Sequence, residues 1–568
     1  MNDNKNMLLA IVLSALVLIG WSLLSDKFFP TAQPQTQQVE NGKVKAAPQA
    51  APAADAPRAI RNREAVLAET PRVRVETTNL KGSINLKGAR IDDLVLVDHG
   101  ESIAKDAKPV RLLSPAGTPQ AYFAQFGWTG QGVAAPDANS VWTASAPVLA
   151  PGKPVTLSWT NPTGQRFEQV VSVDDGYLFT VRQRVVNQGA GVIALRAFGL
   201  ISRSEKSADP STWTNHVGPI SYLDGKADYE VDWDTLDENK AGVTRDSKGG
   251  WLGFTDKYWL TALAPASNAS IEASLRKGGS GAYQADYAGT PFTVAPGQAV
   301  SSESRLFAGA KEKALLDRYE GQGITKLSKS IDWGWFEWFM RPIFGLLQWL
   351  FHATGNFGVA IICLTFIVRL LMFPIADKQF RSMAGMRKVQ PKMKALQERY
   401  KDDKPRLQQE MLKLYQEEKI NPAAGCLPIL LQVPVFYALY KVLMVSVEMR
   451  HQPFVLWIRD LSAPDPMHIL NLFGLLNFTP PSFLAIGPLA LLLGITMWLQ
   501  FKLNPQQMDP TQQQIFAIMP WVLMFVMAPF AAGLLVYWVT SNILTIAQQW
   551  WLYKRYDLHL ADTHPVKT

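Results

Sequence analysis

Arg369 is the residue of this chain whose setting indicates the most specific chemistry. It lies in an apolar run, 357–374, that otherwise has the composition of a membrane-spanning helix. A guanidinium keeps its charge in a protein, and placing one at the middle of a span costs about 2.5–3.5 kcal/mol. An intramembrane arginine therefore indicates a binding site for a polar or anionic group. The alternative is snorkelling to the headgroups, because only about 9 Å of helix separates Arg369 from the end of the run.

Polar side chains on other apolar segments indicate a hydrated cavity shared with Arg369. Thr365 lies four residues before Arg369 and so shares its helix face. Near the C-terminus, Tyr537, Ser541 and Thr545 recur every four residues and form a polar stripe. The alternative is that such side chains only hydrogen-bond between packed helices. Further polar residues of the same kind are Gln432, Thr496, Gln500, Thr540 and Gln548.

Composition places the chain among membrane proteins. Of its 568 residues, 48% are hydrophobic and only 18% charged, below the usual proportion of about 25%. The net charge of +8 indicates basic cytoplasmic loops and anionic lipid before nucleic acid. With Cys363 and Cys426 as its two cysteines, the chain offers no disulfide framework and no CxxC metal site. We expect no metal, no small-molecule cofactor, no catalytic residue and no enzymatic activity.

The first 65 residues are predicted to form an anchor and a tether. Residues 7–24 carry no charge and are just long enough to span a bilayer. A cleaved signal peptide is the alternative, but no small-x-small cleavage site follows. We therefore assign 1–30 to a transmembrane anchor and 31–65, rich in Ala, Pro and Gln, to a disordered linker.

Residues 66–330 are predicted to form a large all-β domain. Apolar and polar residues alternate in short stretches such as 73–77, 155–159 and 179–185, which is typical of half-buried strands in an antiparallel sandwich. A short helix from about 311 closes the domain. The stretch holds no metal-ligand cluster, nucleophile elbow or Gly-rich phosphate loop.

The rest of the chain is predicted to be helical and membrane-bound. Residues 331–352 combine four Trp with interspersed charges, which favours an amphipathic helix in the membrane interface. A core domain follows at 353–552, and 553–568 form a tail. The basic loop 376–422 is expected in the cytoplasm, which places both termini inside and the β domain outside. The core spans are expected at about 356–375, 425–447, 483–501, 515–530 and 532–552, and with the anchor they make six.

The basic loop 376–422 is predicted to fold as a helical hairpin. Apolar residues follow heptad-like spacing on both arms, and a turn lies near Pro405. One interpretation is a solvated coiled hairpin. The other is a docking surface, because methionines adapt to varied apolar partners and basic charge attracts anionic lipid or RNA. The candidate docking residues are Met386, Arg387, Lys388, Met393, Lys394 and Met411.

Four ordered motifs resemble one family. They are Gly355-Asn-Phe-Gly with Thr365 and Arg369, Met386-Arg-x-x-Gln-Pro-Lys, Asn421-Pro-x-x-Gly-Cys-x-Pro-x-x-x-Gln432-x-Pro, and Gly533-Leu-x-x-Tyr537-x-x-x-Ser541-Asn. This set resembles the YidC/Oxa/Alb membrane protein insertases. The early anchor and the long external β domain resemble the Gram-negative YidC form.

The resemblance implies a fold and a function. The fold is a polytopic α-helical membrane protein with six spans, five of them an insertase core around a hydrophilic groove, and an external β-supersandwich. The implied partners are nascent membrane proteins, the ribosome, the Sec translocon and the phospholipid bilayer of the bacterial inner membrane. Trp538 departs from the family pattern, which often has a second Tyr there, and so loses a hydroxyl. The candidate groove residues are Arg369, Thr365, Gln432, Thr496, Gln500, Tyr537, Trp538, Ser541 and Thr545.

The expected function is insertion and folding of nascent inner-membrane proteins, alone or with the Sec translocon. Two other classes stay open from the residues alone. One is a solute transporter with Arg369 as its anion site, although no related halves are visible. The other is a scaffold whose periplasmic domain assembles membrane complexes.

Overall fold

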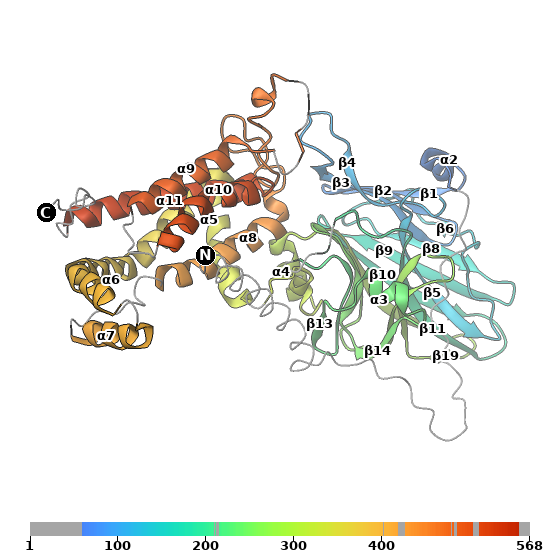
Figure 1. Cartoon of the computed structure of the whole chain (residues 1–568). Coiled ribbons are helices and arrows are strands. Elements are labelled where there is room, and N and C mark those ends of the chain that lie inside the picture. The colour runs from blue at the N-terminus through green and yellow to red at the C-terminus, as the bar shows by residue number, and fades with distance from the viewer. Residues whose placement is uncertain are drawn as a thin grey trace. The chain divides into compact units, whose positions relative to one another are not determined.

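A computed structural model describes residues 60–555, except 210, 212–214, 335, 401–402, 418–426, 477, 479, 482–484 and 504–509. The expected anchor and most of the linker lie outside this range. After the short helix α2 (Arg63–Ala68), the described chain is mainly strands in its first part and helices in its last part (Figure 1).

The β region consists of two large sheets. The first, in spatial order β14-β17-β18-β11-β5-β3-β2-β1-β7 with β19 and β4 beside it, has 11 described strands; the second, β13-β12-β15-β16-β20-β10-β9-β8-β6, has 9. Neighbours pair antiparallel except β1 and β7, which are parallel. The buried faces of both sheets contribute to one hydrophobic core, as expected for a sandwich. The strands are β1 (Arg72–Glu76), β2 (Leu80–Asn85), β3 (Arg90–Gly100), β4 (Pro109–Leu113), β5 (Tyr122–Gln131), β6 (Thr143–Ala144), β7 (Val148–Leu149), β8 (Val155–Thr160), β9 (Gln165–Val173), β10 (Leu178–Asn187), β11 (Ile193–Arg203), β12 (Gly218–Leu223), β13 (Lys226–Asp228), β14 (Val243–Lys248), β15 (Trp251–Thr255), β16 (Trp259–Pro265), β17 (Ser270–Lys277), β18 (Tyr283–Gly289), β19 (Phe292–Val294) and β20 (Ala299–Ala310).

The strands form where alternation predicts them. In β10, buried and more exposed residues alternate from Val181 to Val186, and the same strand pairs with β9 on one side and β20 on the other. Such alternation lets one face bury apolar side chains while the other stays polar. The region is thus mostly β, as expected, with the short helices α2, α3 (Trp233–Glu238) and α4 (Lys313–Gly321) beside the strands.

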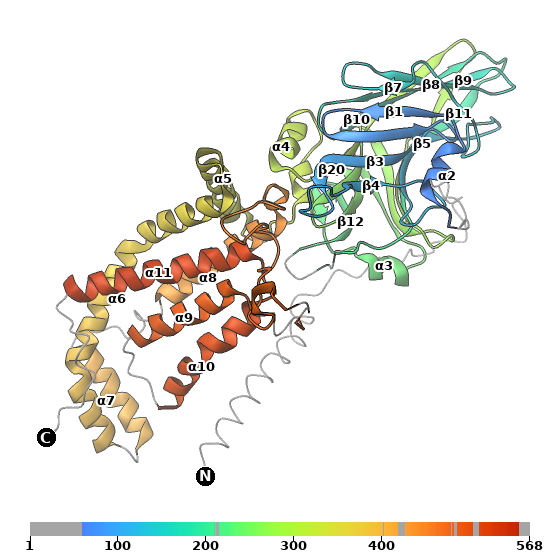
Figure 2. The same ribbon diagram turned by 90° about the horizontal axis from the view of Figure 1, so that it is seen from above.

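Helices make up the C-terminal half. Figure 2 shows α9, α10 and α11 running alongside one another, with α6 extending into a hairpin with α7. The described helices are α2 (Arg63–Ala68), α3 (Trp233–Glu238), α4 (Lys313–Gly321), η1 (Leu327–Ser330), α5 (Glu337–Thr354), α6 (Phe357–Arg399), α7 (Lys404–Glu417), α8 (Leu427–Val445), η3 (Val447–Met449), η4 (Leu472–Gly474), α9 (Pro488–Leu503), α10 (Pro510–Met527) and α11 (Ala532–Arg555).

The boundary between α5 and α6 has a local cause. Gly355 ends α5 with φ +69°, a left-handed conformation that glycine adopts without strain, and its N–H bonds to the carbonyl of Phe351. The Asn356 side chain then caps α6 by accepting from the N–H of Val359. These two residues redirect the chain into the helix that carries Arg369.

The structure differs from the expectation for α6 in one respect. A span at 356–375 and a separate hairpin arm from 376 were expected, but α6 is one helix of 43 residues from Phe357 to Arg399. Neither Pro374 nor Pro391 interrupts it. A proline removes one backbone hydrogen bond, and the remaining bonds continue the helix.

The apolar helices turn large side chains outward. Within α6, the stretch Phe357–Lys378 is long and apolar enough to cross a membrane. Only 22% of the residues in its most apolar part are buried. Leu370 and Leu371 are each 74% exposed. A core helix of a soluble protein would bury these residues. Val433–Val445, Pro488–Leu503 and Ala517–Met527 are shorter apolar helices in the described chain, so the count of six spans stays a prediction.

Candidate functional site

The candidate site forms where α6 and α11 pack together. Arg369 of α6 is half-buried, and its Nη2 donates a hydrogen bond of 2.5 Å to Oγ of Ser541 on α11. No carboxylate among the described residues lies within 4 Å of this guanidinium. The charge thus has a hydroxyl partner but no described counter-ion, which leaves it able to bind an anionic group.

Other predicted groove residues line the same helix faces. Thr365, Tyr537 and Ser541 are almost fully buried, whereas Thr545 is half-buried. The Thr365 hydroxyl donates to the carbonyl of Ile361 at 2.6 Å, and the Thr545 hydroxyl donates to that of Ser541 at 2.7 Å. These threonines satisfy their donors within their own helices, so their oxygens remain available as acceptors.

Thr496 acts differently from the expectation of a cavity-lining residue. Its hydroxyl accepts a 3.1 Å hydrogen bond from Nδ2 of Asn542 and so joins α9 to α11. Both residues are buried. For this pair, the interpretation as packing between helices describes the observed contact. Gln500, one turn further along α9, is half-buried.

Gln548 extends the polar stripe on α11. Its Nε2 atom is buried and makes no hydrogen bond within the described part of the chain. A buried amide donor without a partner is costly, and water or a polar ligand would satisfy it. This atom supports a hydrated site near the stripe.

Trp538 lies at the contact between α8 and α11. The Trp538 ring is half-buried and lies 4.7 Å from the ring of Phe436 on α8, at an interplanar angle of 54°. The large aromatic face of Trp538 thus packs against α8. Gln432 lies on α8 as well, and its side chain is outside the described set.

The sequence reasoning missed Lys441, a second cation in an expected span. Lys441 of α8 is 1% exposed, and its Nζ lies 3.1 Å from a carboxylate oxygen of Asp332, just before α5. The signal was present, because Lys441 interrupts an apolar segment as Arg369 does. The two cations differ in their partners. Lys441 pairs with the carboxylate of Asp332, whereas Arg369 bonds to the hydroxyl of Ser541.

The hairpin of α6 and α7 has its own small core. Val389, Met393 and Leu414 are buried together, and Met411 and Tyr415 pack against them. Met393 is therefore part of the contact that holds the arms together, and Met411 is half-buried against it. Their expected role in docking a partner stays a prediction. The side chains of Met386, Arg387, Lys388 and Lys394 lie outside the described set.

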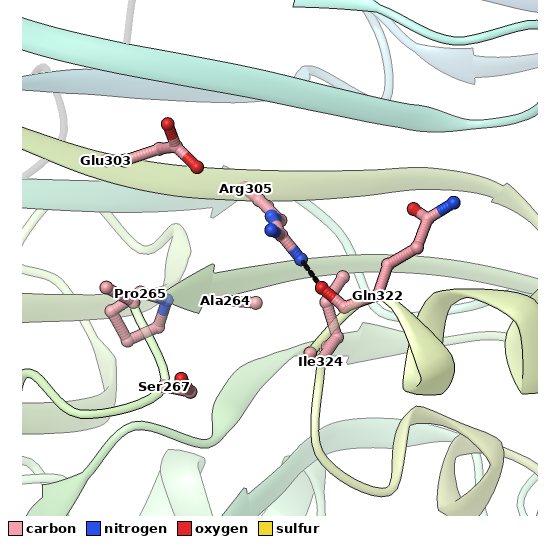
Figure 3. Close-up of a pocket in the computed structure, with 9 residues that line it drawn as sticks. Ala264, Pro265, Ser267, Glu303, Arg305, Gln322 and Ile324 are labelled. Carbon is pink, nitrogen blue, oxygen red and sulfur yellow. Dashed lines mark hydrogen bonds between the residues drawn. The ribbon is translucent and has the colours of Figure 1, made fainter.

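A pocket also occurs in the β region, but its residues do not indicate a reaction. It has a volume of about 140 Å³ and lies beside the end of β16 and the middle of β20. Figure 3 shows Arg305 pointing to the backbone of Gln322, to which Nη1 donates at 2.6 Å. The guanidinium of Arg305 thus bonds to the backbone of another residue that lines the pocket. Within the described ranges, no group of three or more His, Cys, Asp or Glu residues is arranged to hold a metal.

Comparisons with known proteins cover nearly the whole chain. The family model for the YidC periplasmic domain matches residues 72–346, and that for the 60Kd inner membrane protein matches 349–559. The membrane protein insertase YidC of Zymomonas mobilis is 46% identical over 98% of this chain and 96% of its own length. That of Rhizobium etli is 43% identical over 99% of this chain and 97% of its own length.

A solved structure of an active YidC insertase with its first transmembrane domain resolved is 17% identical, with a TM-score of 0.36, over 94% of this chain and 98% of that one. The assignment rests on the sequence relatives, which cover 98–99% of this chain at 43–46% identity. The chain belongs to the YidC family of membrane protein insertases.

Proposed function

We propose that this protein inserts nascent membrane proteins into the bacterial inner membrane and that Arg369 transiently binds polar or acidic groups of the inserting chain. The observation that carries the proposal is the Arg369–Ser541 pair, in which a half-buried guanidinium has a hydroxyl partner and no described carboxylate nearby. A structural arginine would be expected to have a fixed acidic partner, as Lys441 has in Asp332. The guanidinium of Arg369 can release the hydroxyl of Ser541 and bind a carboxylate of the substrate instead.

The energetic problem of insertion is the polar segment that must cross the membrane. Moving unpaired polar groups into hydrocarbon costs several kcal/mol each, roughly 2–7 by reference state. Arg369 is half-buried and offers a charge-assisted partner, and the buried hydroxyl of Ser541 holds its guanidinium in place. The unpartnered amide of Gln548 favours water in the same region. Together these groups lower the desolvation cost of the polar segment.

The apolar segment of the substrate follows the outward faces of α8 and α11. Val433 on α8 and Ile543 on α11 are large apolar residues exposed on these helices. A substrate helix can contact them while it remains in lipid, so its apolar side chains are never transferred to water. The polar and apolar parts of the substrate thus use different sides of the same helices.

The family places the protein in the inner membrane with a periplasmic domain. In the arrangement proposed here, both termini and the α6–α7 hairpin lie in the cytoplasm. The hairpin meets the nascent chain, the ribosome and the Sec translocon there, and its basic loop, enriched in Lys and Arg, supports this orientation. The mechanism involves positioning and solvation, with no covalent step.

Substrates of matched sequence test the role of Arg369. Two forms of a short membrane protein are needed, one with an acidic outer segment and one with the acids changed to Asn and Gln. Arg369→Ala should impair insertion of the acidic form strongly and of the neutral form weakly, and Arg369→Lys should retain most activity. Arg182→Ala, at an exposed arginine on β10, is the control and should have no effect.

The readout is protease protection of the outer segment in vesicles that contain the purified variants. Equal loss for the acidic and neutral substrates would show that Arg369 supports the fold and not the substrate. Full activity of Arg369→Ala on both forms would remove the charge from the mechanism.

A further inference from the structure

The connection between α8 and α9 displays an unusual set of apolar side chains. Leu456 is 85% exposed and Leu475 is 84% exposed. Figures 1 and 2 both show this connection, in orange, at the end of α9 opposite to the α6–α7 hairpin. Other exposed large apolar residues of the connection are Val455, Leu470, Leu472, Phe473, Leu476 and Phe478.

Three of these residues also have a strained backbone. Leu456, Leu472 and Phe473 have φ values of +56°, +49° and +59°. Bulky side chains rarely adopt this left-handed region, and such residues are retained where the surroundings fix them for a purpose. Conformational strain and exposure of apolar surface are both unfavourable in water, so an interaction that covers the side chains is expected.

The base of the connection is fixed by hydrogen bonds. Asp465 is buried; its Oδ1 accepts from Nε1 of Trp457 at 3.0 Å, and its Oδ2 accepts from the N–H of Leu489 at the start of α9, also at 3.0 Å. The N–H of Ile469 donates to the carbonyl of Ile486 at 3.0 Å. The apolar tip from 470 to 478 therefore extends from an ordered base.

Five N–H groups of the tip are satisfied by carbonyls of the same connection. The N–H groups of Leu472, Phe473, Leu475, Leu476 and Phe478 each donate to a carbonyl between residues 468 and 476. Non-helical backbone in contact with hydrocarbon must be satisfied internally, because no water is present to do it. An ordinary surface loop has no such requirement.

The tip and the helix that follows it also lack charged residues. No Asp, Glu, Lys or Arg occurs from Ile469 to Phe501, a stretch that comprises the tip and nearly all of α9. On α9, Ile495 faces outward, as a lipid-facing side chain does. The tip is thus an uncharged continuation of an apolar helix surface.

We propose that the exposed apolar side chains of this connection insert into the periplasmic leaflet of the bilayer and anchor the α8–α9 connection there. They are Leu456, Leu470, Leu472, Phe473, Leu475, Leu476 and Phe478. The partner is lipid, at the boundary between headgroups and acyl chains. Contact with lipid covers the exposed leucines and stabilises the strained conformation. The rival occupant is the polypeptide being inserted.

Depth-dependent quenching in vesicles tests the proposal. The full chain is made with Cys363 and Cys426 changed to Ser, and a single cysteine replaces Leu475 or Leu456. An environment-sensitive fluorophore is attached, and the protein is reconstituted in phosphatidylcholine–phosphatidylglycerol vesicles without substrate. Lipids with a nitroxide near the headgroup should quench both probes several-fold more than they quench a probe at Val192, a 65% exposed residue between β10 and β11.

A probe at Leu370, exposed on α6, serves as the positive control for lipid contact. Probes at Leu456 and Leu475 that behave like the one at Val192, with quenching by aqueous iodide and none by lipid, would overturn the proposal. Quenching by lipid that disappears when a stalled substrate is added, with crosslinks to that substrate, would assign the tip to the polypeptide instead. Insertion activity of the same vesicles is measured separately, so loss of lipid contact and loss of insertase function are distinguishable.

Discussion

The guanidinium of Arg369 on α6 donates to the hydroxyl of Ser541 on α11 across 2.5 Å, in a bond that joins residues 172 positions apart. The serine hydroxyl accepts from one of the five N–H donors of the arginine, and it is neutral, so it does not balance the positive charge. The pair therefore holds the side chain in place between the helices and leaves capacity for a second partner.

Removing the hydroxyl should measure how much this bond holds the helices together. Ser541→Ala is expected to lower the free energy of unfolding in detergent by about 1 kcal/mol, since hydrogen bonds in membrane proteins contribute about 0.6 and at most about 1.7 kcal/mol. Thr540→Ala on the same helix is the control, because its hydroxyl donates only to the carbonyl of Val536.

A double-mutant cycle with Arg369→Gln isolates the pair. If the two substitutions prove additive, the hydroxyl and the guanidinium do not interact in solution. Insertion of acidic-tailed substrates should survive Ser541→Ala better than Arg369→Ala, since the cation is retained.

Lys441 and Asp332 should behave as a buried ion pair. Asp332→Asn alone leaves the charge of buried Lys441 without this carboxylate and is expected to cost about 3–5 kcal/mol of stability. Lys441→Met leaves the half-buried carboxylate of Asp332 and should cost less. The double change Lys441→Met with Asp332→Leu should be close to neutral, because neither group is then left unpaired. Thermal unfolding in detergent compares the three variants.

The exposed ion pair of Lys413 and Glu410 on α7, at 2.9 Å, provides the comparison. Lys413→Met should change stability little, since solvent screens such pairs. A small effect of Asp332→Asn, similar to that of Lys413→Met, would contradict the buried-pair interpretation.

The periodicity of the sequence predicted well whether a region forms strands or helices. It predicted less well where a helix ends. Alternation identified strands such as β8 (Val155–Thr160), because one buried face imposes a period of two on the sequence. It did not show that α6 continues through Pro374 into the hairpin. Hydropathy reports where the surroundings change from lipid to water, and a helix can continue across that boundary.

Arg369 could be found from the sequence because its apolar surroundings make it exceptional. Its partner Ser541 could only be assigned to a polar stripe, because pairing depends on how two helices rotate against each other. The same limit explains Asn542, which bonds Thr496 but gave no separate signal. Which polar residues join helices and which face a substrate is decided by packing that a one-dimensional pattern does not contain.

The stability of the β region should depend on pH through Asp286. Burial raises the pKa of this carboxyl on β18 to about 6, against the opposing effect of Arg276. The folded state therefore holds the proton between about pH 4 and 6 while the unfolded state has released it, so this group makes the free energy of unfolding fall as pH rises through that window. Two units of pKa correspond to about 3 kcal/mol.

Asp286→Asn removes the titration, and the melting temperature of the variant relative to the parent should rise from pH 4 to 6 and then level off. A flat difference for Asp286→Asn would mean that burial does not control this carboxyl.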